Sequence, residues 1–144
     1  MPDTSAISIQ RKYYADTASD YDQMHLMDAE HNVALDHICS EMFRMNLSSM
    51  LDVGCGTGRG VKYLLDRKLD VKGVEPVQAL LDAGCKQHDL PSDRMLLGSG
   101  EKLSFEDNAF DATMELGVLH HVPDPPMVVA EMIRVSRRAI FISD

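Results

Sequence analysis

The chain has 144 residues, of which 44% are hydrophobic and 26% are charged. This length and composition are those of one globular domain with its own core, and they exclude a disordered chain. Asp and Glu total 23 against 14 Lys and Arg, so the formal net charge is −9. Without a run of basic residues, such a chain is unsuited to binding nucleic acid or an anionic membrane.

Cysteine use and the N-terminal residues indicate the cellular setting. The three cysteines, Cys39, Cys55 and Cys85, lack a C-x-x-C spacing and predict neither a disulfide framework nor a zinc site. The first ten residues, MPDTSAISIQ, lack the cationic and apolar segments of a secretion signal, and no apolar run is long enough to cross a bilayer. We therefore expect a soluble, cytoplasmic chain with one domain, 1–144, and no metal or membrane partner.

The N-terminal third is expected to form helices. Residues 11–28 are polar, contain three tyrosines, and predict a short helix or an ordered loop. Residues 29–46 predict one long amphipathic helix with four apolar residues at helical spacing, namely Val33, Ile38, Met42 and Met45. We assign residues 1–46 to an N-terminal helical cap that precedes a core of residues 47–144.

Strand and helix signals alternate through the rest of the chain. Strands are expected at 49–53, 70–75, 94–99, 109–116 and 138–143, and helices at 59–68, 77–88 and 125–137. This alternation predicts a mostly parallel sheet with helices on both faces, in a Rossmann-like, doubly wound α/β fold. Ligands in such folds bind beyond the carboxyl ends of the strands, near the switch in strand order.

Residues 51–60, LDVGCGTGRG, contain four glycines just after the first predicted strand. A turn without a ligand is one explanation, but glycine is also used where the backbone closely approaches a ligand. The dinucleotide motif G-x-G-x-x-G is absent, because its third glycine would fall on Arg59 or on Val61. A P-loop is absent as well, since no Gly-Lys-Ser or Gly-Lys-Thr follows.

Two acidic residues indicate the chemistry of a ligand at this loop. Asp52 precedes the first glycine, where it would repel a pyrophosphate and suit a cation such as an amino-acid ammonium group. Glu75 ends the next predicted strand, where a carboxylate can accept hydrogen bonds from both ribose hydroxyls. S-Adenosylmethionine carries an α-amino group, a ribose and an adenine, and it fits both acids.

With these motifs the sequence resembles the class I S-adenosylmethionine-dependent methyltransferases, most closely the methyltransferase type 11 group. The similar segments are YYADTASDYD, LDVGCGTG, VKGVEP, GSGEKLSFEDNAFD, LGVLHHVPDP and RAIFIS. The resemblance implies S-adenosylmethionine as cofactor and S-adenosylhomocysteine as product. The cofactor-binding residues that it implies are Tyr14, Asp52, Gly54, Cys55, Gly56, Glu75, Pro76, Ser99, Gly100, Glu101, Leu116 and Gly117.

The resemblance leaves several individual roles open. Ser99 stands where many relatives carry an Asp that binds the adenine amino group, so we expect a weaker or water-mediated adenine contact. Leu116 to His120 should border the sulfonium, and His120 is a candidate catalytic base or a bystander. His121 is expected to form a wall or to be exposed, and Tyr14 either closes over the cofactor or only packs its own segment.

We interpret the chain as an S-adenosylmethionine-dependent methyltransferase that transfers the methyl group in line to a small-molecule acceptor. Relatives in the resembled family continue with two more strands, and we expect these to be missing here. The alternative is therefore a catalytically silent or partner-dependent S-adenosylmethionine-binding module. The strand at 138–143 should lie at an edge of the sheet. We expect a homodimer or a partner chain to pair through residues 139–143.

Overall fold

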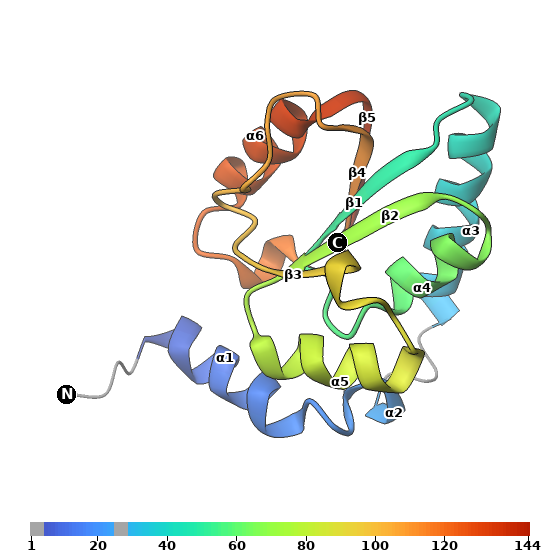
Figure 1. Ribbon diagram of the computed structural model, residues 1–144. Helices are drawn as coiled ribbons and strands as arrows, with labels where there is room; N and C mark the ends of the chain where they lie inside the picture. Colours follow the sequence, from blue (N-terminus) through green and yellow to red (C-terminus); the bar gives the residue numbers. More distant parts are fainter. Residues whose placement is uncertain (1–4, 25–28) are drawn as a thin grey trace.

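A parallel β-sheet lies at the centre of the molecule (Figure 1). The structure is a computed structural model that describes residues 5–24 and 29–144. Its five strands are β1 (Ser49–Val53), β2 (Asp70–Glu75), β3 (Met95–Leu97), β4 (Phe110–Leu116) and β5 (Ser136–Ser143). They are ordered β3-β2-β1-β4-β5, and all four neighbouring pairs are parallel.

The strand order reverses at β1. The chain moves outward from β1 to β2 and β3, then returns to β4 on the other side of β1 and ends with β5. Asp52 accordingly has Gly73 of β2 and Met114 of β4 as its two register partners. The predicted doubly wound α/β fold is confirmed, and its switch point lies between the carboxyl ends of β1 and β4.

Helices cover both faces of the sheet. The helices are α1 (Ala6–Thr17), α2 (Tyr21–Met24), α3 (Ala29–Arg44), α4 (Arg59–Asp66), α5 (Gln78–His88) and α6 (Pro125–Val135), with 3₁₀ turns at Ser92–Arg94 and Leu119–His121. Figure 1 shows α6 on one face and α3, α4 and α5 on the other. None of the helices in the described ranges is both long and apolar enough to cross a bilayer.

Alternation of side chains along β1 divides the core between these faces. Met50 packs into the cluster formed with α3, α4 and α5. Leu51 and Val53 pack into the cluster formed with α6. Asp52 therefore points to the face that α3 and α4 cover, although it is a charged residue.

Helices α1 and α2 pack along α5, below the sheet in Figure 1. Ala18, Val77 and Leu80 form a small buried cluster there, and Tyr14 and Tyr21 pack against it. No residue of α1 is itself buried. Helix α1 therefore packs on the rest of the molecule through side chains that are only partly buried.

The observed elements differ from the predicted ones in places. The segment 11–28 contains parts of two helices, and its last four residues lie outside the described ranges. In α3 the buried residues are Leu35, Ile38, Cys39 and Met42. Val33 is 55% exposed, because the buried stripe with spacing i, i+3, i+4, i+7 begins at Leu35. β3 is shorter than predicted, and β5 begins at Ser136, directly after α6.

Candidate functional site

A glycine-rich loop connects β1 to α4. Three of its residues have positive φ angles: Gly54 (+76°), Gly56 (+57°) and Gly58 (+84°). The amides of Gly54 and Cys55 both donate to the carbonyl oxygen of Val74, at 2.8 and 3.0 Å. A Cβ at Gly54 would also lie 2.6 Å from the Val118 side chain. Backbone conformation and close packing thus both require glycine at this position.

The loop packs tightly on its neighbours. A Cβ at Gly84 of α5 would lie 1.8 Å from the carbonyl oxygen of Thr57, so α5 touches the loop backbone directly. Cys55 packs against β2, where a Cβ at Gly73 would lie 2.5 Å from its Sγ. Burial raises the pKa of the Cys55 thiol well above its usual range. Cys55 is therefore a packing residue, held as the neutral thiol.

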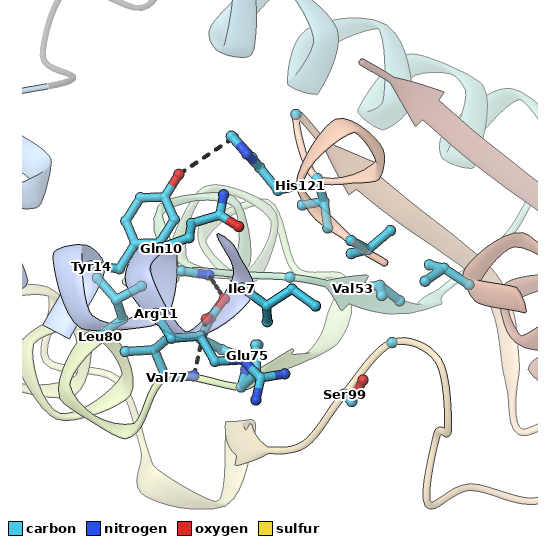
Figure 2. Close-up of a pocket in the computed structure, with 18 of the residues that line it drawn as sticks. Ile7, Gln10, Arg11, Tyr14, Val53, Glu75, Val77, Leu80, Ser99 and His121 are labelled. Atoms are coloured by element: carbon cyan, nitrogen blue, oxygen red, sulfur yellow. Dashed lines mark hydrogen bonds between the residues drawn. The ribbon is translucent and has the colours of Figure 1, made fainter. Parts of the chain in front are cut away.

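Glu75 joins the end of β2 to this loop (Figure 2). Its Oε2 accepts the amide of Gly56 at 3.0 Å, and its Oε1 accepts the amide of Val77 at 3.1 Å. The side chain is buried, and this burial raises its pKa, while the two backbone hydrogen bonds and Arg11 act in the opposite direction. Each carboxylate oxygen retains a lone pair for a further donor.

Three buried carboxyl groups lie on the adjacent strands β2, β1 and β4. Like Glu75, Glu115 has both oxygens bonded to backbone amides, those of Val118 at 2.9 Å and Ser143 at 3.0 Å. Within the described residues, Asp52 makes no such hydrogen bond. Burial, reinforced by the charges of Glu75 and Glu115, raises the pKa of Asp52 to about 7. Asp52 therefore has unused acceptor capacity.

A cavity opens where the glycine loop, β2 and β4 end. Its empty space, including the open mouth, is about 870 Å³. One face of α1 forms a wall of this first cavity, with the spacing i, i+3, i+4, i+7, through Ile7, Gln10, Arg11 and Tyr14 (Figure 2). Pro76, Ser99 and His121 line other parts of it.

A second cavity lies between the loop and α3. It shares Tyr21, Gly54, Gly56 and Leu116 with the first cavity. Its polar lining comes from His31, Asn32, Asp52, Thr57, Arg59 and Tyr63. The guanidinium of Arg59 lies 3.3 Å from Nδ1 of His31. An acid and a guanidinium thus line the same small space.

The structure brings most of the predicted site residues together. The first cavity contains Tyr14, Gly54, Gly56, Glu75, Pro76, Ser99, Gly100, Glu101, Leu116 and Gly117. Asp52 and Cys55 lie at the second cavity instead. His120 lines neither cavity.

The two adjacent histidines lie with their ring centroids 3.8 Å apart, yet only His121 lines a cavity. The Nδ1 of His120 lies 2.6 Å from Oδ1 of Asp144, and its side chain is 53% exposed. His121 lines the first cavity, and its Nε2 lies 3.4 Å from the Tyr14 hydroxyl (Figure 2). The structure thus places His121 at the cavity where the sequence suggested His120. Burial and the nearby His120 lower the pKa of His121, partly offset by Asp144.

Several of the residues that line the cavities were not identified from the sequence. Ile7, Gln10 and Arg11 lie on a polar helix, and it is only when the bounds of this helix are known that they are seen to share one face. His31 and Arg59 lie 28 residues apart, and nothing local relates them. Among the described residues, no three His, Cys, Asp or Glu side chains form a group that could hold a metal ion.

Comparison with known proteins identifies the family. A sequence profile described as "Methyltransferase domain" matches residues 51–141, from β1 into β5. The chain belongs to this methyltransferase-domain family. The matched range includes the glycine loop, Glu75 and both histidines.

Individual relatives agree with this assignment. An uncharacterized methyltransferase of Mycobacterium tuberculosis is 38% identical over 88 residues, which are 61% of this chain and 35% of that protein. The phthiotriol/phenolphthiotriol dimycocerosates methyltransferase of Mycobacterium leprae is 32% identical over 98 residues, which cover 65% of this chain and 36% of that protein. The chain thus spans about a third of the curated relatives that it matches.

A solved structure shows the same fold. A SAM-dependent methyltransferase from Thermotoga maritima superposes with a TM-score of 0.67 at 19% identity, over 86% of this chain and 55% of that one. At this identity the similarity concerns the fold alone.

Asp52 gives a prediction for the stability of the ligand-free protein. An acid whose pKa is higher in the folded state stabilises the fold at low pH and loses this contribution as pH rises through the folded pKa. For Asp52 this window runs from about 4, the ordinary value, to about 7. Relative to the parent, Asp52→Asn should therefore gain about 1–4 kcal/mol of unfolding free energy across this window.

Urea unfolding at about pH 4 and pH 8 measures this change. Asp93→Asn is the control, because Asp93 is an exposed acid on the surface turn Ser92–Arg94. If the difference in unfolding free energy between Asp52→Asn and the parent is the same at both pH values, the pKa of Asp52 is not raised in the folded protein.

Proposed function

We propose that this chain binds S-adenosylmethionine and forms the cofactor-binding part of a methyltransferase that acts on a small molecule. The observation that carries the proposal is the Glu75 carboxylate, fixed by the amides of Gly56 and Val77 at the edge of the first cavity. When bound, S-adenosylmethionine supplies a methyl group that is activated by its sulfonium centre. The family match favours an enzyme over a catalytically silent module.

The nucleoside end of the cofactor is assigned to the first cavity. Glu75 would accept hydrogen bonds from ribose hydroxyls through the lone pairs that its backbone bonds leave free. Pro76 and the Ser99–Gly100 segment line the same cavity beside Glu75 and would contact the adenine. Glycine at position 100 is required by packing, because a Cβ there would lie 2.8 Å from the Val53 side chain.

The amino-acid end is assigned to the second cavity. Asp52 lies there as a buried acid without a hydrogen bond from the described residues, and an ammonium group would satisfy it. The guanidinium of Arg59 lines the same cavity and suits a carboxylate. A zwitterionic amino-acid group therefore matches both charges of the lining.

His121 is our candidate for the residue that takes up a proton. A hydroxyl or amine acceptor loses a proton when it is methylated, and a neutral imidazole can receive that proton. Because its pKa is lowered, His121 is neutral near pH 7. The Tyr14 hydroxyl, within reach of Nε2, would orient the ring and close the cavity from the α1 side.

The class of acceptor is proposed from the net charge and from the shape of the site. The net charge of −9 disfavours a nucleic acid, and a concave site lined by apolar and polar side chains suits a small molecule. We also propose a cytoplasmic location, on the sequence grounds given above.

The free edge of β5 is our candidate for an association surface. In the described part of the chain, β5 pairs with β4 on one side and with no strand on the other. Ile142 is 48% exposed on this strand. Exposed apolar edges act as templates for pairing with another strand. We propose that residues 139–143 pair with a second copy or with a separate chain.

Replacement of Glu75 tests the cofactor site. Glu75→Gln should weaken S-adenosylhomocysteine binding by about 1.5–3 kcal/mol, because it removes a charged acceptor. Calorimetric titration measures the affinity, and circular dichroism verifies the fold. Glu106→Gln, at an exposed position, should bind like the parent. Undiminished affinity in Glu75→Gln would remove Glu75 from the site.

The two histidines form a matched pair for testing the proton acceptor. With an O- or N-acceptor that supports turnover, His121→Gln should lower the rate by about 10²–10⁴-fold, while His120→Gln should change it little. The parent rate should fall at acidic pH as His121 becomes protonated, beginning below the usual histidine pKa of about 6.5. S-Adenosylhomocysteine formation measures the rate. A larger loss in His120→Gln would reverse the assignment.

The edge proposal predicts a change in oligomeric state. Ile142→Lys should dissociate an edge-paired assembly of the parent while leaving S-adenosylhomocysteine affinity nearly unchanged, because a charge opposes strand pairing. Sedimentation velocity at micromolar concentration measures the state of both proteins. A parent that sediments as a monomer throughout would contradict pairing between copies.

A further inference from the structure

Asp22 connects three parts of the chain that are distant in sequence. It lies in α2, and its Oδ1 accepts a hydrogen bond from the Thr57 hydroxyl in the glycine loop. Its Oδ2 contacts Nε2 of His88, in the last turn of α5. Nε of Arg59, at the start of α4, lies 3.8 Å from Oδ1. The Asp22 side chain is only 16% exposed, so this contact is largely shielded from water.

The neighbour of Asp22 is part of the site. Tyr21 lines both cavities. Its ring lies over the glycine loop, where a Cβ at Gly56 would come within 3.7 Å of Cε1. Asp22 itself lines neither cavity. Any effect of Asp22 on a ligand must therefore pass through the elements that it holds.

Helix α1 leads directly into the segment that carries Asp22. One face of α1 forms a wall of the first cavity, yet none of its residues is buried. Its C-terminal end is held by the packing of Tyr14 and by a hydrogen bond from Gln87 to the carbonyl of Ser19, at 2.9 Å. Beyond the end of α1, the Asp22 carboxylate accepts the hydrogen bond from Thr57. A hydrogen bond to a charged group is stronger than one between neutral groups.

We infer that Asp22 is a positioning residue. By joining α2 to the glycine loop and to the end of α5, it fastens Tyr21 and α1 at the cavities that they line. The inference rests on the proposed cofactor site. The covering segment, residues 5–24, is held in place before the ligand arrives. When a binding-competent arrangement is only partly populated, apparent affinity falls in proportion to that population. Loss of the Asp22 contacts should therefore weaken binding without removing any group that touches the ligand.

Hydrogen exchange without ligand tests the fastening directly. Asp22→Ala should increase amide exchange in residues 5–24 and leave β1 and β4 protected as in the parent. His88→Ala should act in the same direction, and the double variant should not exceed Asp22→Ala by much, because Asp22→Ala already removes the contact with His88. Asp20→Ala is the matched control, an exposed acid in the same segment, and should exchange like the parent.

Titration with S-adenosylhomocysteine tests the effect on the site. Asp22→Ala should bind about tenfold more weakly than the parent. Asp22→Asn should recover most of the affinity, because its amide oxygen can still accept from Thr57. If Asp22→Ala loosens the whole fold, His88→Ala replaces it in both measurements.

The outcomes separate the two claims. A parent that does not bind would contradict the proposed function, whereas the exchange data would still decide whether Asp22 holds the segment. A parent that binds, with Asp22→Ala equal to it in both affinity and exchange, would overturn the inference. Rescue by Asp22→Asn together with faster exchange in Asp22→Ala would support it.

Discussion

The hydrogen bond from the Gly56 amide to the Glu75 carboxylate connects the loop after β1 to the end of β2. Two further amides of the loop bond to Val74, so the loop is fixed along the carboxyl edge of β2. Both cavities use this loop as a wall, and Tyr21 rests on it at Gly56. The shape of the whole site therefore depends on the conformation that Glu75 stabilises.

The same edge of the sheet concentrates negative charge. Glu75 and Glu115 are balanced by backbone amides, whereas Asp52 is left as a buried acid with a raised pKa. The unfavourable electrostatics of ligand-free Asp52 would be relieved by a cationic group. Arg11 of α1 also lowers the pKa of Glu75. The charge of Arg11 on α1 thus acts on Glu75 in the first cavity. A change in the position of α1 would therefore change the electrostatics of the site.

Much of the fold could be predicted because its signals are local. The apolar strands, the glycine loop and the acid that ends β2 lie within short segments, and the parallel topology follows from their alternation. The role of α1 could not be predicted in this way, since a helix without buried residues has no apolar stripe to reveal which face is covered. His120 and His121 could not be told apart, because the rotation of one 3₁₀ turn decides which ring reaches the cavity. Gly84 was also missed, since its partner Thr57 is distant in sequence.

The central claim is that the glycine loop and Glu75 form a site for an adenosyl amino acid and not for a dinucleotide. Calorimetric titration of the parent chain with S-adenosylmethionine, S-adenosylhomocysteine and NAD tests it most directly. The account predicts saturable binding of the first two at one site per chain and no binding of NAD. Binding of NAD at least as tight as that of S-adenosylhomocysteine, or no binding of either sulfur compound by the folded chain, would contradict it.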